Sequence, residues 1–397
     1  MSLKQLVNNH EDYLIETRQY LHRHPELSGQ EVATSKFLQD EVKKYNLPII
    51  QASKTGFIAI LDTGKAGKTI GLRADIDALP IFETEENLKQ ERIVRSENPG
   101  VMHACGHDAH MAMLLTSMKI LVEIKDQLSG KIIFIFEEGE EQWTGIYEMV
   151  ETLKDYPLDA VYGMHVYSDL EAGKIAVDPG PVMAGAVNFQ LTIHGKSGHV
   201  GLPERAISPI YAGADIVNKV VYAWENELQV SERVSLGIAQ FTAGEDGGNV
   251  IPGQAVISGS LRSYAIEEAR KGADLIEAIA EKIGNEHDCR ISFTTKNKPL
   301  FYPVDNDEHL ARTAQNALKK NAPEALITDK RWFASESFPQ YGELAPTVFA
   351  FVGIKNEAYG SGAEHHNEYF DIDDKGLKYG VLAEVGFVVD MLSENND

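Results

Sequence analysis

Cysteine is scarce in this sequence, with only Cys105 and Cys289 among 397 residues. Two cysteines cannot build the disulfide framework of a small secreted protein, so we expect a reducing compartment, the cytoplasm. Long apolar runs are also absent, and no stretch reaches the roughly 20 residues that a membrane-spanning helix needs. The first residues contain neither an apolar core nor a small-residue cleavage site, so no signal peptide is expected.

Basic residues are in deficit as well. The 37 lysines and arginines face 60 aspartates and glutamates, which gives a formal net charge of −23. That balance argues against nucleic acid or an anionic membrane as a partner. A hydrophobic content of 43% and a charged content of 24% are those of a globular protein. The length favours two domains over one core.

One short polar stretch, residues 101–110, gathers side chains that bind metals or move protons. They are His103, Cys105, His107, Asp108 and His110. Cys105 and His107 lie two apart across a glycine, so in a turn both can point into one space, and thiolate with imidazole is a typical metal donor pair. The apolar run 111–122 follows at once, so we expect a helix N-terminus that favours the thiolate of Cys105. The alternative is a His-rich loop with a buried, inert cysteine.

Three predicted strands lead into acidic residues or histidine. Residues 69–74 run into Asp75 and Asp77, whose alternate spacing projects both carboxylates to one side of a sheet. Residues 160–164 run into His165. Open α/β sheets place their sites at such strand ends, so these side chains are candidates for one common site.

The third strand, residues 131–136, runs into a cluster of acids. We expect Glu137 and Glu138 to be solvated loop residues. Glu140 and Glu141 follow a buried strand, where a carboxylate pair can divide into one metal ligand and one general base.

The pattern of apolar and polar residues changes after residue 183. Alternating apolar residues at 186–194, two amphipathic helices and three further strands give the order β-α-β-β-α-β, which matches the ferredoxin-like split motif. We therefore expect an inserted domain over residues 184–296, between two parts of an outer domain, residues 1–183 and 297–397. In the outer domain, residues 4–23, 31–45, 307–321 and 375–392 are predicted helices.

Several motifs, found in a common order, carry a resemblance to a known family. They are Arg73-Ala-Asp-Ile-Asp-Ala-Leu-Pro80, Met102-His-Ala-Cys-Gly-His-Asp-Ala-His110, Glu140-Glu141, Gly163-Met-His165, and His366 with Phe370-Asp371. With them the chain resembles, over nearly its whole length, the N-acyl-amino-acid amidohydrolases of the dinuclear metallopeptidase superfamily. That group holds hippurate hydrolase, aminoacylase and indole-acetyl-amino-acid hydrolase. The resemblance implies an α/β catalytic domain, a mixed and mostly parallel sheet flanked by helices, with an inserted α+β ferredoxin-like domain for lid and dimer contacts.

The resemblance also implies two divalent metal ions per subunit. By motif, the ligands fall on Cys105, His107, Glu141, His165 and His366. His365 is an adjacent rival for the last position. Counting back from Phe370 selects His366, although Glu368 stands where the family usually has proline. Zinc or manganese is expected, and a mixed donor set also accepts cobalt or nickel.

By the same resemblance, the catalytic base falls on Glu140. Glu138 is a rival, because the acid run is longer here than in the family. Asp75, Asp77 and Asp108 are candidates for groups that orient the metal-binding histidines. The alternative for Asp75 is a strand-end cap.

His199 lies on a glycine-bracketed turn of the insertion and resembles the family residue that stabilises the oxyanion of a neighbouring subunit. We therefore expect a homodimer or a dimer-based oligomer. The alternative is an ordinary surface histidine.

Three further residues match family positions that contact substrate. Arg262 suits bidentate capture of an α-carboxylate. Asn249 and Glu336 match the others, and Ser337 stands where the family usually has aspartate. This departure leaves the identity of the substrate open.

The sequence thus predicts metal-dependent hydrolysis of the amide bond of N-acyl amino acids, where the acyl group is acetyl, benzoyl or similar. A dipeptidase or carboxypeptidase that acts on short peptides is an alternative with the same chemistry. A second alternative makes Cys105 a nucleophile with His107 or His103 as its base. A third is a metal-sequestering protein that has kept the fold without the activity.

Overall fold

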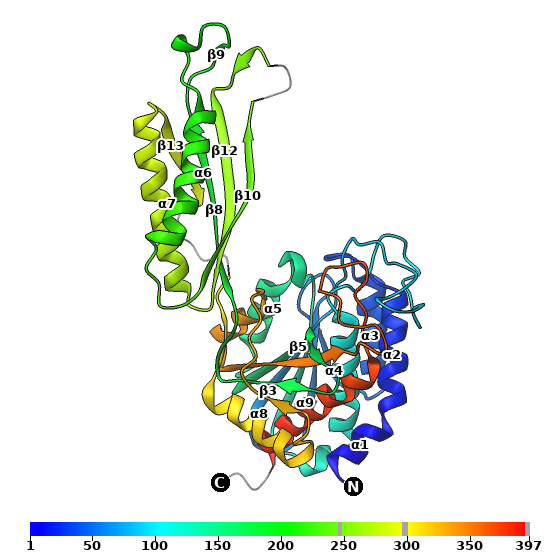
Figure 1. The fold of residues 1–397 in the computed structure, drawn as a ribbon. Helices are drawn as coiled ribbons and strands as arrows, with labels where there is room; N and C mark the ends of the chain where they lie inside the picture. The colour runs from blue at the N-terminus through cyan, green and yellow to red at the C-terminus, as the bar shows by residue number, and fades with distance from the viewer. Residues whose placement is uncertain (245–247, 296–300, 394–397) are drawn as a thin grey trace. The chain divides into compact units, whose positions relative to one another are not determined.

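The computed structural model describes residues 1–244, 248–295 and 301–393, and the chain forms two compact units (Figure 1). Unit 1 comprises Met1–Gly180, Asp305–Lys330 and Ser337–Asp397. Unit 2 comprises Pro181–Val304 and Arg331–Glu336. The expected boundaries of an insertion at 184–296 stay a prediction.

Unit 1 is built on an eight-stranded sheet with the order β1-β2-β4-β3-β5-β16-β6-β15. Its strands are β1 Ile49–Gln51, β2 Phe57–Asp62, β3 Thr69–Asp75, β4 Lys131–Glu137, β5 Ala160–Glu171, β6 Ile175–Ala176, β15 Leu326–Ile327 and β16 Thr347–Lys355. The central strands β4, β3, β5 and β16 are parallel, while β1, β2 and β6 join antiparallel to their inner neighbours. The mixed, mostly parallel sheet confirms the predicted fold class.

Helices cover this sheet. They are α1 Leu3–Asn9, α2 Glu11–Arg23, α3 Val32–Lys43, α4 His107–Glu123, α5 Ile146–Leu153, α8 Glu308–Asn321 and α9 Leu377–Leu392, with short 3-10 turns η1 Lys125–Gln127, η2 Glu140–Gln142, η4 Phe338–Glu343 and η5 Asp374–Gly376. Helix α4 packs on β3 and β5, and α9 packs on α4 and β16. Both helices are apolar over nearly their whole circumference, which is typical of helices buried in a core.

The register of the central strands brings polar side chains to one edge. Asp75, the last residue of β3, pairs with Glu137, the last residue of β4. On the other side of β3, Arg73 pairs with Gly163 of β5. Parallel strands end at the same edge of a sheet, so the turns after β3 and β4 and the middle of β5 lie together.

Unit 2 has a four-stranded antiparallel sheet with the order β10-β12-β8-β13. Its elements are β8 Gly185–His194, β9 Gly198–His199, η3 Pro203–Arg205, α6 Pro209–Asn226, β10 Val234–Ala243, β11 Val250–Ile251, β12 Gln254–Ser263, α7 Ile266–Glu286 and β13 Arg290–Thr295. Helices α6 and α7 pack on the sheet and on each other. Two short strands, β7 Gly180–Met183 and β14 Val304–Asn306, form a separate two-stranded sheet.

Two expected elements differ from the structure. The helix predicted over residues 4–23 is two helices, because the backbone leaves helical geometry at His10 (φ −110°, ψ 8°). The strand that was expected to end at His165 continues to Glu171, because β16 pairs with β5 along that length. Within the described residues, none of the helices combines the length and apolarity needed to cross a membrane.

Candidate metal centre

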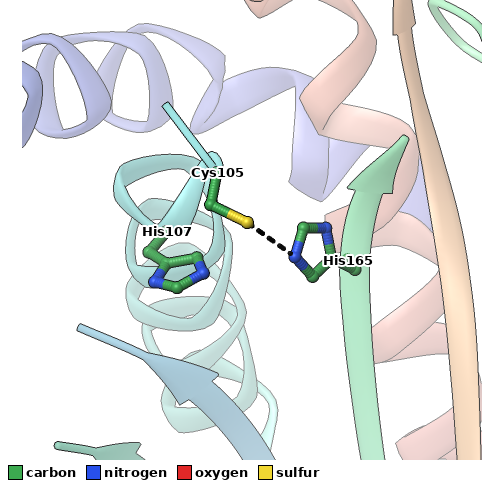
Figure 2. A group of neighbouring side chains, drawn as sticks. All are labelled: Cys105, His107 and His165. Atoms are coloured by element: carbon green, nitrogen blue, oxygen red, sulfur yellow. Dashed lines mark hydrogen bonds between the residues drawn. The ribbon is translucent and has the colours of Figure 1, made fainter. Parts of the chain in front are cut away.

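A tight turn before α4 presents Cys105 and His107. Gly106 between them is the N-cap of α4 and has φ +93°, in the left-handed region that favours glycine. A Cβ atom at this position would lie 2.3 Å from Cγ2 of Val166 on β5. Glycine therefore allows both the turn and the close approach of β5. Figure 2 shows Cys105 and His107 on the same side of this turn, facing β5.

His165 reaches the same space from β5. Its Nε2 lies 3.4 Å from Sγ of Cys105, the contact drawn in Figure 2. Its Nδ1 lies 2.7 Å from the carbonyl oxygen of Val166, so that nitrogen donates and Nε2 is left as the unprotonated one. A thiol and a neutral imidazole nitrogen thus face each other, as a shared metal requires.

Glu141 and His366 complete the cluster. Glu141 follows β4 in the turn η2, and its Oε1 lies 3.1 Å from Nε2 of His366 and 3.9 Å from Nε2 of His107. The carboxylate is 12% exposed and the His366 ring is 52% exposed. This side of the cluster is therefore open to solvent.

The ring of the rival His365 lies 5.3 Å from that of His165, and one of its nitrogens is used in a hydrogen bond. Nε2 of His365 accepts a hydrogen bond of 3.3 Å from the backbone N–H of Ser168. Burial lowers the pKa of His365 to about 3, with His366 adding to the effect. The geometry therefore favours His366 as the metal ligand.

The five predicted ligands fall into two overlapping groups that share Cys105. In each group the donor atoms lie within 4.8 Å of one another. The first group is Cys105, His107 and His165, and the second is Cys105, Glu141 and His366. Two further groups, His107 with Glu140 and Glu141 and His107 with Asp75 and His110, meet the same limit. Two adjacent donor groups of this kind fit a pair of metal ions.

The electrostatics of the cluster fit a bound cation. Burial opposes the charged form of His107, but the carboxylates of Asp75, Asp77 and Glu141 outweigh it and raise the pKa of His107 to about 10. Nε2 of His107 makes no hydrogen bond in the described part of the chain, and Oε1 of Glu141 makes none beyond its 3.1 Å contact with Nε2 of His366, although both atoms are buried. A divalent cation would pair with both atoms and supply the positive charge that these carboxylates favour.

The pKa of the Cys105 thiol differs from the expectation. We expected the N-terminus of α4 to favour the thiolate. Instead, burial raises the pKa of the Cys105 thiol well above its usual value, and the charges of Glu141, Glu140 and Asp75 act in the same direction. Without a cation this cysteine is a poor nucleophile, whereas a metal ion would deprotonate it.

Carboxylates behind the cluster hold its histidines. Oδ1 of Asp77 lies 2.9 Å from Nδ1 of His107, and its Oδ2 accepts from the backbone N–H of Glu141 at 3.1 Å. Asp75 lies 2.6 Å from Nδ1 of His110, whose Nε2 accepts the backbone N–H of Val166 at 2.9 Å. Both aspartates thus orient residues around the candidate ligands, a common arrangement at metal sites.

Asp108 faces the other way. It forms an ion pair with Arg18 at 3.1 Å and a hydrogen bond with His22 at 2.8 Å, both from α2. Burial opposes the carboxylate, but Arg18 and His22 outweigh it and hold the pKa of Asp108 well below its usual value. Asp108 therefore anchors the first turn of α4 to α2, on the side away from the donor cluster.

Glu140 lies beside the ligands and is 7% exposed. Its Oε1 accepts from the backbone N–H of Ser337 at 3.0 Å. The rival Glu138 accepts instead from the backbone N–H of Thr55 at 2.8 Å. It serves the turn before β2 and is largely buried. The expectation that Glu138 is a solvated loop residue was wrong.

Glu137 was expected in solvent too, and it is fully buried. Its Oε2 accepts from Nε of Arg73 and from the hydroxyl of Tyr341, both at 2.7 Å, and its Oε1 accepts from Oγ of Ser337 at 2.5 Å. Arg73 also donates to Asp75 at 2.8 Å. This network was not predicted from the sequence, although one arginine inside the apolar strand 69–74 was its signal.

The remaining predicted residues belong to unit 2. His199 on β9 pairs with Val250 on β11, and the backbone N–H of Val200 donates to the carbonyl of Asn249 at 3.2 Å. The structure thus brings His199 and Asn249 together on one exposed loop pair. Arg262 lies at the end of β12 and donates to Oγ of Ser335.

Glu336 is buried at the end of the second segment of unit 2. The roles assigned to His199, Asn249, Arg262 and Glu336 stay predictions.

Three relatives are similar to this chain over most of its length. An IAA-amino acid hydrolase ILR1-like 4 from Arabidopsis thaliana is 31% identical over 98% of this chain and 87% of its own. A thermostable carboxypeptidase 2 from Saccharolobus solfataricus is 31% identical over 96% of both chains. An N-acyl-L-amino acid amidohydrolase from Geobacillus stearothermophilus is 37% identical over 73% of this chain and 78% of its own.

A solved structure and a family profile agree with these relatives. The YxeP protein of Bacillus subtilis, described as a dinuclear metal-binding peptidase, has a TM-score of 0.82 and 29% identity, and the match covers 96% of this chain and 98% of that one. The profile of peptidase family M20/M25/M40 matches residues 71–386. The chain therefore belongs to this family and is one of its metal-dependent amidohydrolases and peptidases.

Proposed function

We propose that the protein hydrolyses the amide bond of N-acyl amino acids and releases a carboxylic acid and a free amino acid. The observation that carries the proposal is the pair of donor groups that share Cys105, with Glu140 beside them. Relatives named as amidohydrolases of acylated amino acids support the choice of substrate class. Acetyl, benzoyl or similar acyl groups are the expected substrates.

Two divalent cations would be held by Cys105, His107, Glu141, His165 and His366. When bound, such ions activate water and polarise an amide carbonyl. Cysteine and histidine donors favour zinc, and manganese, cobalt or nickel would also suit the mixed set.

Glu140 is the proposed general base. It takes the proton from the attacking water and later gives it to the leaving amine. The backbone N–H of Ser337 donates to Oε1 of Glu140 at 3.0 Å and holds this carboxylate beside the donor groups. His199 is proposed to stabilise the oxyanion from a neighbouring subunit, so the active protein would be a homodimer or a dimer-based oligomer. Arg262, with Asn249 and Glu336, is proposed to bind the substrate and its α-carboxylate.

A second candidate is peptidase action on dipeptides or on the C-termini of short peptides. The similarity to a thermostable carboxypeptidase at 31% identity favours it. Both reactions use the same donor cluster. They differ in the group on the acyl side of the amide bond, which is a simple acyl group in one and an amino acid or peptide in the other.

A substrate panel tests the choice. Protein purified without added metal is analysed for its elements, reconstituted with Zn²⁺ or Mn²⁺, and assayed with N-acetyl and N-benzoyl amino acids and with dipeptides. We expect release of free amino acid from the acylated substrates at a higher kcat/KM than from dipeptides. Turnover of dipeptides alone would overturn the first proposal and favour the second.

Replacing the base provides the matched test of mechanism. Glu140→Gln should lower kcat by about 10²–10⁴-fold while metal content stays that of the unmodified protein. Glu138→Gln is the matched control, because the carboxylate of Glu138 lies two residues away in sequence and accepts the backbone N–H of Thr55. This variant should retain activity within about tenfold. If Glu138→Gln loses activity and Glu140→Gln does not, the assignment of the base is wrong.

A further inference from the structure

His366 presents its ring from a loop without helix or strand. Every residue between the end of β16 at Lys355 and the start of η5 at Asp374 is described, and none is in a regular element. The His366 ring is 52% exposed, so packing does not hold it in place. Its φ is +61°, a value that L side chains rarely adopt. The backbone around His366 must therefore be held by contacts from other segments.

One such contact is made by the backbone of His366 itself, and others are made by residues that follow it in the sequence. The backbone N–H of His366 donates to the carbonyl of Ala104, next to Cys105, at 2.9 Å. After the ring, the carbonyls of Glu368 and Phe370 accept hydrogen bonds of 2.8 Å and 2.7 Å from Nη2 and Nη1 of Arg92. One guanidinium group thus spans two carbonyls that lie two and four residues beyond the candidate ligand.

Arg92 is itself rigidly placed. Its side chain is fully buried, and its Nε donates to the carbonyl of Thr84 at 3.0 Å. The backbone N–H of Thr84 in turn donates to the carbonyl of Glu368 at 3.3 Å, and the Thr84 hydroxyl lies 2.6 Å from the carbonyl of Glu86 and 2.9 Å from that of Glu368. Carboxylates of Glu83 and Asp371 lie 3.5 Å and 3.8 Å from Nη1 of Arg92 and balance its charge.

We propose that Arg92 is a positioning residue of the metal centre, whose buried guanidinium fixes the backbone that presents His366. The inference rests on the proposed dinuclear site, in which Cys105, Glu141 and His366 form one donor group. Lysine keeps the charge but lacks the planar fork that spans two carbonyls, so Arg92→Lys isolates the geometry from the charge.

The experiment measures metal affinity rather than turnover. Metal-free protein is titrated with Zn²⁺ against a chromophoric chelator, and two binding steps are expected. His366→Ala identifies the step that depends on the second donor group. Arg92→Lys should weaken that same step by about 10- to 100-fold, the usual effect of a group that orients a ligand, and should leave the other step unchanged.

A double variant separates positioning from general loss of structure. If Arg92 acts through His366, the double variant Arg92→Lys with His366→Ala should bind Zn²⁺ no more weakly than His366→Ala alone. The matched control is Arg95→Lys, three residues along the same segment, whose guanidinium is 43% exposed and contacts only the exposed Glu85 in the described residues. This control should bind both ions normally.

Normal binding of both ions by Arg92→Lys, or additive losses in the double variant, would overturn the inference. If Arg92→Lys fails to fold, Arg92→Gln also removes the guanidinium fork, and unchanged affinity in that variant overturns the inference equally. An unmodified protein that takes up no metal would contradict the proposed function instead, so the two failures are distinguishable.

Discussion

Glu384 is a single carboxylic acid buried in the apolar core, on α9. Burial raises its pKa to about 8, and the Ser117 hydroxyl only partly opposes this shift. An acid whose pKa is higher in the folded than in the unfolded chain favours folding less as pH rises. The contribution is complete below the ordinary value of 4.5 and is lost as pH rises through about 8.

We therefore expect Glu384→Gln to flatten the pH dependence of stability. At pH 5 the free energies of unfolding of the two proteins should differ by less than about 1 kcal/mol, because this pH lies only just above 4.5, the ordinary pKa that holds in the unfolded chain. At pH 9 the variant should be the more stable, by on the order of a few kcal/mol. Denaturant unfolding at both pH values measures the difference. An equal difference at pH 5 and pH 9 would show that Glu384 is not the group that titrates.

Single residues also show what sequence alone could predict. The donors Cys105 and His107 were predictable, because one glycine between them fixes their spacing. The burial of Glu137 was not, since its partner Ser337 lies 200 positions away in sequence. From sequence alone, a run of acidic residues is expected to lie in solvent. Only the folded chain shows that Arg73 pairs with Glu137. His366 was chosen over His365 from the sequence, by counting back from Phe370, and the fold adds that Nε2 of His365 accepts the backbone N–H of Ser168.

At the scale of elements, the turn before α4 is the most constrained part of the site. Gly106 combines a positive φ with a close approach to Val166 on β5. Gly106→Ala should therefore cost more than the roughly 1–2 kcal/mol of a left-handed residue, because a Cβ must also displace β5. Since His165 lies on β5 next to Val166, we also expect weaker metal binding.

Gly64→Ala is the matched control for this turn. Gly64 has φ +75°, but nothing lies within 4 Å of a Cβ built on it. Gly64→Ala should lose only the free energy of unfolding that a left-handed alanine backbone costs, and it should bind metal normally. Unfolding free energies and Zn²⁺ affinities of the two variants measure the contrast. Equal losses of stability, with equal metal affinity, would show that the contact with β5 is unimportant.

Elements were predictable where their periodicity was strong and their ends were marked. Helix α8 begins after Asp307, whose side chain accepts the backbone N–H of Leu310 as a cap should, and it ends at Asn321 as predicted. The division of residues 4–23 into α1 and α2 was not predictable, since apolar spacing continues across His10. The extension of β5 beyond His165 depends on pairing with β16, a contact made over nearly 200 residues of chain.

At the scale of the molecule, the candidate ligands come from four separate segments of unit 1. They are the turn before α4, the turn η2 after β4, the middle of β5 and the loop before η5. Bound cations would therefore crosslink segments that are distant in sequence. They would also neutralise a group of buried carboxylates in a chain whose net charge is −23.

Removal of metal should accordingly destabilise the folded chain. A ligand that binds only the folded state adds about 4 kcal/mol of stability when its free concentration is 1,000 times its Kd. We expect a chelator to lower Tm, and added Zn²⁺ to restore it. Glu140→Gln should show the full change, because Glu140 is not a proposed ligand, whereas His366→Ala should show a smaller one. If the chelator leaves Tm unchanged, or if Glu140→Gln loses the response, the ligand set proposed for this centre is wrong.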